Sequence, residues 1–140
     1  MRTKTFEKVL DSEYVTIRHC PDERLLWNEW KGAIPSGKLR AAVRFASEYV
    51  AANNIELILA DFSRMHAPSR EDQVWIARTG ARILQHSKLR KVANLTSSDI
   101  FGQIALETIY DIAAETPLPC EVRNFISEQS AAEWLYSKER

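Results

Sequence analysis

The chain has 140 residues, 45% of them hydrophobic, which is the length of one domain and enough apolar material for a core of its own. This composition excludes an intrinsically disordered chain, and the length excludes a two-domain enzyme. Lys plus Arg and Asp plus Glu each number 19, so no net charge attracts the whole molecule to nucleic acid.

Several classes of protein are excluded by what the sequence lacks. No apolar run approaches the roughly 20 residues that a membrane-spanning helix needs. Residues 1–8 lack the apolar segment of a signal peptide, so we expect a cytoplasmic protein. Cys20 and Cys120 have no CxxC spacing, which excludes a disulfide scaffold and a cysteine zinc site.

The first half of the chain predicts a hairpin, a helix and a buried strand. Residues 14–20 and 25–31 are rich in β-formers and are separated by a turn at Pro21, as in an antiparallel hairpin. From Leu39 to Val50 the apolar residues recur at helical spacing. The continuously apolar stretch 57–60 is typical of a strand that is covered on both faces.

The second half continues the alternation of helices and strands. A second helix begins after Pro68-Ser69, with Ser69 as its N-cap and Asp72 completing an approximate capping box. The remaining elements are a strand at 92–96, a third helix capped by Ser98-Asp99 and running to about Glu115, a strand at 121–126, and a closing helix capped by Ser127.

The order ββαβαβαβα predicts an α/β domain. We expect a mostly parallel five-stranded sheet with an N-terminal antiparallel hairpin, flanked by four helices. Residues 14–137 form this single domain, and residues 1–13 form an N-terminal arm.

Five stretches, spread over most of the chain, resemble a known group of small bacterial proteins described as STAS/SEC14-like, with the SpoIIAA-like fold of anti-sigma-factor antagonists. The stretches are 13–17, 30–32, 59–65, 71–76 and 99–103. The resemblance implies a SpoIIAA-like fold and, for most such domains, a non-enzymatic interaction module.

In STAS antagonists, a serine in the loop after a central strand is phosphorylated to switch partner binding. The resemblance places the start of that loop at Asp61-Phe62-Ser63, and carries the acceptor over to Ser69, with Ser63 as a second candidate. A phosphate at Ser69 would meet the free N–H groups at a helix N-terminus. The alternative is that Ser69 is simply an N-cap.

Residues 32–38 satisfy the spacing GxxxxGK of a phosphate-binding loop, through Gly32, Gly37 and Lys38, and Asp61 follows the next strand. The position that should bind magnesium through a hydroxyl is Leu39, and the preceding strand belongs to a hairpin. Nucleotide binding is therefore only a third hypothesis.

No other constellation predicts catalysis. Asp61, Ser63 and His66 supply the residue types of a hydrolytic triad, but they are crowded into one loop without a GxSxG elbow. The three histidines are too dispersed for a metal site. We expect no enzymatic activity, no metal and no cofactor.

The second helix predicts an interaction patch. Its apolar face leaves Trp75 on the polar side beside Arg78, Arg82 and His86, as in an interface hot spot. A cation–π stack that covers the ring is the alternative. On the third helix, Ile100 and Ile104 lie outside the core stripe and extend the predicted patch.

Charge is segregated along the chain although it sums to zero. Residues 73–98 hold no acid, and residues 99–122 hold no base. The basic stretch contains Arg78, Arg82, Lys88, Arg90 and Lys91. We expect a basic side and an acidic side, which favour a protein partner or a homodimer.

Two functions from different classes follow. The first is a non-enzymatic STAS-like interaction module. The second is a binder of a small apolar or lipid-like ligand, indicated by the SEC14-like resemblance and by Trp27, Trp30, Phe45 and Phe62. A large apolar pocket would favour the binder, and a closed core with an exposed patch around Trp75 would favour the module.

Overall fold

The predicted α/β architecture is confirmed in a computed structural model that describes residues 5–97 and 99–138. The described residues form one mixed sheet with the strand order β1-β2-β3-β4-β5-β6. Strands β2 (Val15–Cys20) and β3 (Leu25–Gly32) pair antiparallel, and β4 (Leu57–Met65), β5 (Lys91–Leu95) and β6 (Glu121–Phe125) all run parallel to β3. Both features were predicted.

The sheet has six strands where the sequence predicts five. The additional strand, β1 (Glu7–Asp11), lies within the expected N-terminal arm and pairs antiparallel with β2. Its register shifts between Lys8 and Leu10, and Val9 and Leu10 pack against the core. This irregularity breaks the alternation of polar and apolar residues that predicts a strand.

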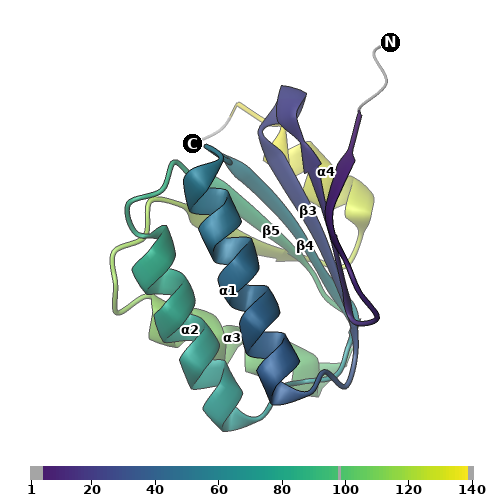
Figure 1. Ribbon diagram of the computed structural model, residues 1–140, viewed down its shortest axis with the longest axis vertical. Helices are drawn as coiled ribbons and strands as arrows, with labels where there is room; N and C mark the ends of the chain where they lie inside the picture. Colours follow the sequence, from purple (N-terminus) through teal and green to yellow (C-terminus); the bar gives the residue numbers. More distant parts are fainter. Residues whose placement is uncertain (1–4, 98, 139–140) are drawn as a thin grey trace.

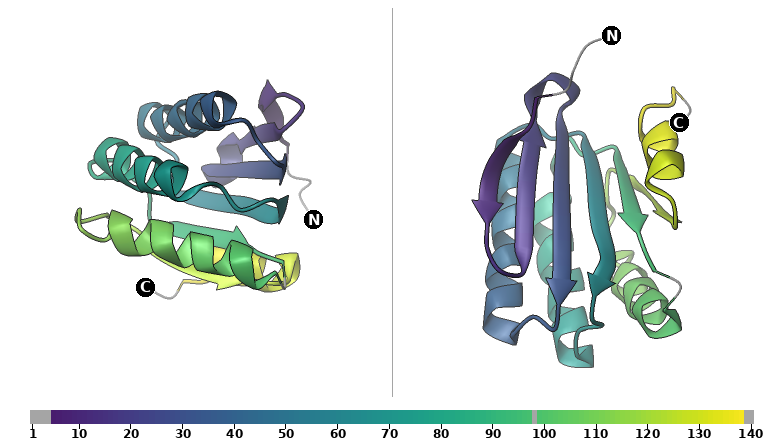
Figure 2. Two further views of the ribbon diagram at one scale, coloured as in Figure 1. Left: turned by 90° about the horizontal axis from the view of Figure 1, so that it is seen from below. Right: turned by 90° about the vertical axis from the view of Figure 1, so that its right-hand side faces the viewer.

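Helices cover both faces of the sheet (Figures 1 and 2). Helices α1 (Ser36–Ala52), α2 (Arg70–Leu84) and α3 (Ile100–Ala113) lie side by side on one face, and α4 (Glu128–Leu135) lies on the other. A connecting helix between parallel strands must return over one face of the sheet, so the three βαβ units form a continuous layer. This layer is where the candidate site lies.

The predicted helix starts are observed where the structure describes them. The Ser69 hydroxyl accepts a hydrogen bond from the Asp72 N–H, and the Ser127 hydroxyl accepts one from the Ser130 N–H. Ser98, the predicted cap of the third helix, lies outside the described residues. Strand β4 continues five residues beyond the apolar stretch, to Met65, because residues past Asp61 still pair with β3.

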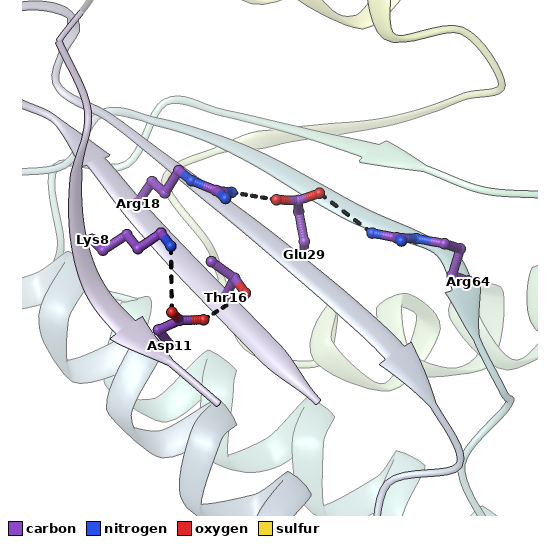
Figure 3. A network of polar contacts seen from close by, with 6 residues as sticks. All are labelled: Lys8, Asp11, Thr16, Arg18, Glu29 and Arg64. Atoms are coloured by element: carbon purple, nitrogen blue, oxygen red, sulfur yellow. Dashed lines mark hydrogen bonds and ion pairs between the residues drawn. The ribbon is translucent and has the colours of Figure 1, made fainter. Parts of the chain in front are cut away.

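Helix α4 covers only the side of its face formed by β4, β5 and β6 (Figure 2). The other side carries polar side chains joined by hydrogen bonds and ion pairs (Figure 3). Glu29 binds Arg18 and Arg64, and Asp11 binds Lys8 and Thr16. The uncovered strands therefore present polar groups to water, as expected for a sheet face without a covering layer.

None of the described helices is both long enough and apolar enough to cross a membrane. Among the same residues, no three His, Cys, Asp or Glu side chains are grouped so that they could hold a metal ion.

Candidate functional site

A cavity of about 200 Å³ lies between the sheet and the layer of helices α1, α2 and α3. Its walls are mainly apolar and come from seven elements, the strands β3 to β6 and the helices α1, α2 and α3. They include Val43 of α1, Trp30 of β3, Ile58 and Phe62 of β4, Ile76 of α2 and Ile109 of α3. Of the four aromatic residues that the sequence offered for an apolar ligand, Trp30 and Phe62 line the cavity and stack on each other, 6.2 Å apart between ring centroids.

The cavity exists because small residues meet where the helices face the sheet. Ala60 of β4 and Ala77, Gly80 and Ala81 of α2 line the cavity, and Ala77 and Ala81 also pack against Ala113 of α3. A Cβ atom added at Gly80 would meet no heavy atom within 4 Å. Large side chains on neighbouring turns hold the two layers apart, and the small residues leave the space between them unfilled.

The cavity approaches solvent at the carboxyl ends of the parallel strands. His66 and Ala67, in the loop between β4 and α2, are the exposed residues of its lining. In open α/β sheets this edge is where ligands usually bind, because the loops between strands and helices gather there. The loop 66–69 therefore forms the entrance.

Three asparagines and one alanine cross the sheet at one register. Asn28 of β3 is aligned with Ala60 of β4, then with Asn94 of β5 and Asn124 of β6. We call these four residues the asparagine row. The Asn94 amide donates to Asn124 Oδ1 over 3.1 Å, and Asn94 Oδ1 accepts from the Tyr110 hydroxyl over 3.5 Å.

Two titratable groups of the lining are held in their neutral forms. Burial raises the pKa of Tyr110 to about 12, although the hydrogen bond to Asn94 acts in the opposite direction. Burial also raises the pKa of the Cys120 thiol. At neutral pH the cavity therefore contains a phenol and a thiol, which are poor nucleophiles compared with their anions.

The seam between α1 and α2 forms the outer wall of the cavity. Asp72 is buried there, and its Oδ1 accepts hydrogen bonds from Ser36 Oγ at 2.7 Å and Arg40 Nε at 2.8 Å. The Trp75 ring lies beside this cluster, with the guanidinium carbons of Arg40 and Arg44 5.2 and 5.6 Å from its centroid.

The predicted interaction patch is spread over several environments. Trp75 is half-buried, and the cations stacked on it come from α1 instead of from its neighbours on α2. Arg78 and Arg82 are exposed on α2, His86 is exposed just after the end of α2, and Ile104 is 52% exposed on α3. The side chain of Ile100 lies outside the described residues.

Both candidate phospho-acceptors hydrogen-bond locally. Ser69 is exposed and caps α2, as described above. The Ser63 hydroxyl donates to Asp61 Oδ1 over 2.6 Å, and the same oxygen accepts the Ser63 N–H.

The residues of the GxxxxGK alternative do not gather around a phosphate site. Gly32 ends β3 with a φ of +80°, Gly37 is exposed in α1, and the Lys38 ammonium lies 5.5 Å from the Tyr14 ring centroid. Asp61 continues the alternation of Leu57 and Leu59, which pack with α4 on the opposite face of the sheet from α1.

Comparison with known proteins identifies the fold. No family model matches the sequence, and no curated protein is significantly similar to it. Among solved structures, the chain is similar to an uncharacterized protein of the DUF3478 family from Shewanella loihica PV-4, described as having a SpoIIAA-like fold. The TM-score is 0.56 at 12% sequence identity, over 94% of this chain and 92% of that one. The chain has a SpoIIAA-like fold.

The SpoIIAA-like fold was expected from the sequence, whereas the cavity followed only from its second hypothesis, the apolar-ligand binder, which did not locate it. One feature of the sequence pointed to the polar residues near the cavity. Asparagine is uncommon inside strands, yet three of the predicted strands carry one, at positions 28, 94 and 124. Their shared register forms a polar strip that runs from the buried Asn28 and Asn94 to the exposed Asn124 on the edge strand, and only the pairing of the strands reveals it.

Proposed function

We propose that this protein binds a small, mainly apolar molecule in the cavity between the sheet and helices α1, α2 and α3. The observation that supports the proposal is the cavity itself, which has apolar walls from seven elements and an entrance at His66 and Ala67. A concave apolar site with a few polar groups is the usual form of a small-molecule site.

The volume of the cavity limits the size of the ligand. An apolar cavity of about 150 Å³ binds benzene, and sites for drug-sized molecules have about 300 to 1,000 Å³. With about 200 Å³, this cavity fits a small fused-ring system or a short alkyl chain. A long acyl chain would require the helices to move.

We propose binding without chemical conversion. Tyr110 and Cys120, the nucleophilic groups at the walls, are neutral at physiological pH because burial raises the pKa of each. The remaining polar groups of the buried lining, in Asn28, Ser47 and Thr96, are an amide and two hydroxyls. Such groups orient a ligand through hydrogen bonds.

Filling the cavity with a side chain tests the proposal. Gly80→Leu should weaken the binding of the bicyclic hydrocarbon indane at least tenfold, because the leucine occupies the space of the ligand. The thermal midpoint should stay the same or rise, since glycine inside a helix costs about 1 kcal/mol relative to alanine. Isothermal titration calorimetry and thermal melting measure the two effects.

Gly37→Leu is the matched control. A Cβ at Gly37 also meets no atom within 4 Å, but the residue is exposed on α1 and does not line the cavity. This variant should bind indane like the wild type. Unchanged indane affinity in Gly80→Leu, or no binding to the wild type, would contradict the proposed site.

The interaction module, with its phosphorylation switch and homodimer, stays a prediction. Arg78, Arg82, His86 and Ile104 are exposed and available to a partner. The apolar cavity is the feature that separates the two hypotheses, and it favours the ligand binder.

A further inference from the structure

Asn28 brings a hydrogen-bond donor to the apolar cavity. The residue is 5% exposed and belongs to the cavity lining. Its Oδ1 accepts a hydrogen bond from Trp30 Nε1 over 2.6 Å. Because an indole nitrogen can only donate, the atom that faces it must be the amide oxygen. The amide nitrogen Nδ2 is therefore left for another partner.

Within residues 5–97 and 99–138, no protein atom accepts a hydrogen bond from Asn28 Nδ2. Asn94, its counterpart in the asparagine row, uses its own Nδ2 to bind Asn124. Between them, β4 contributes only Ala60, which has no polar side chain. Among the described residues, Trp27 Nε1 is the fully buried side-chain atom without a partner, so Asn28 Nδ2 keeps some accessible surface. Because Asn28 lines the cavity, an acceptor from outside the chain can reach this nitrogen there, and polar groups inside proteins are almost always paired.

The charges around the cavity determine which acceptor fits. No Lys, Arg, Asp or Glu is among the lining residues, and the histidine at the entrance, His66, is exposed. A carboxylate or phosphate at Asn28 would lie in apolar surroundings without an opposite charge, which is unfavourable. A neutral oxygen loses far less hydration and regains a hydrogen bond.

From these observations we infer that the ligand is a neutral molecule with an apolar body and a carbonyl-type oxygen that accepts the Asn28 Nδ2–H. This inference rests on the proposed function, and it adds the chemical class of the ligand and the residue that recognises it. The apolar body fills the space beside Ala60 and Gly80, and the oxygen lies at the asparagine row.

A pair of probes of nearly the same shape tests the inference. Indane has no acceptor, whereas 1-indanone carries one carbonyl oxygen. We expect the ratio of the two affinities, ketone over hydrocarbon, to fall about tenfold in Asn28→Leu, because the hydrogen bond is lost. Calorimetry with both probes on each variant gives the ratio. A change in the shape of the cavity alters the affinities of both probes, so its effect cancels in their ratio.

Asn124→Leu is the matched control. It removes an asparagine of the same row and the partner of Asn94, but Asn124 does not line the cavity. This variant should keep the wild-type ratio. A third probe, indane-1-carboxylate, should bind at least tenfold more weakly than 1-indanone at neutral pH, and equal binding would overturn the requirement for a neutral ligand.

An infrared measurement on the wild type decides the matter if Asn28→Leu does not fold. The carbonyl band of bound 1-indanone should lie at lower wavenumber than in a hydrocarbon solvent, because the oxygen accepts a hydrogen bond. An unshifted band, or an unchanged ratio in a folded Asn28→Leu, would overturn the inference while leaving the proposed function intact. If neither indane nor 1-indanone binds the wild type, the proposed function fails as well.

Discussion

Replacing Lys91 by methionine should lower the free energy of unfolding by about 3 kcal/mol. Lys91 is 3% exposed, and its ammonium donates to the carbonyl oxygens of Trp134 and Ser137 at 2.9 and 3.0 Å. It also reaches Ser137 Oγ at 3.0 Å and lies 5.1 Å from the Trp134 ring centroid. Methionine keeps the length of the side chain but loses the charge and all three hydrogen bonds.

The physical reason lies at the C-terminus of α4. The last carbonyl groups of a helix have no partners within it, and they form the negative end of its dipole. Lys91, the first residue of β5, binds one of these carbonyl groups, that of Trp134, and also the carbonyl of Ser137 just beyond the helix, and so fastens α4 to the sheet. The sequence assigned Lys91 to an exposed basic side, which was wrong because the charge is used inside the fold.

Urea denaturation of the wild type and Lys91→Met measures the effect. Lys88→Met is the control, since Lys88 is an exposed lysine of the same basic stretch. It should change the unfolding free energy by less than about 0.5 kcal/mol. If Lys91→Met unfolds at the wild-type urea concentration, the buried hydrogen bonds do not contribute as described.

Asp72→Asn should destabilise the protein by about 2 kcal/mol at pH 7, and by progressively less below about pH 4. Burial raises the pKa of Asp72, but the hydrogen bonds from Ser36 and Arg40 and the charge of Arg40 outweigh it, so the pKa lies below the ordinary value. A carboxyl whose pKa is lower in the folded state stabilises the fold above its unfolded pKa. This contribution disappears as the pH falls through the folded pKa.

Unfolding free energies at pH 7 and at several values between pH 5 and pH 3 test the direction as well as the size. Glu71→Gln is the control, because Glu71 is an exposed acid in the same first turn of α2. We expect Glu71→Gln to change the free energy of unfolding only slightly, and this change should not depend on Ser36 or Arg40. A difference between wild type and Asp72→Asn that grows on acidification would contradict the assignment.

The Asp72 cluster also bears on the proposed ligand site. It joins the N-terminal turns of α1 and α2, whose inner faces contribute Leu39, Val43 and Ile76 to the cavity. Loss of the Asp72 charge should weaken the contact between α1 and α2 and so loosen this wall of the cavity. The indane affinity of Asp72→Asn therefore reports how far the cavity depends on the seam.

Much of the fold followed from local patterns in the sequence. Helical spacing from Leu39 to Val50, the N-caps at Ser69 and Ser127, and the apolar stretch 57–60 each depend on near neighbours in the chain. Strand β1 was missed because its register shift disrupts the alternation, and the pairing with β2 stabilises it instead.

By itself, the sequence determined the order of the elements after β1 and the parallel sheet with its hairpin, because both depend on periodicity and on the handedness of connections. The resemblance of five stretches to a known group implied the SpoIIAA-like fold. Only the tertiary structure decided where the candidate site lies. The cavity depends on small residues, among them Ala60 and Gly80, that line it from two different layers, and the free donor of Asn28 depends on what the neighbouring strand places beside it. Such unfilled volumes and unpaired groups arise between residues that are far apart in the chain, so local sequence patterns cannot predict them.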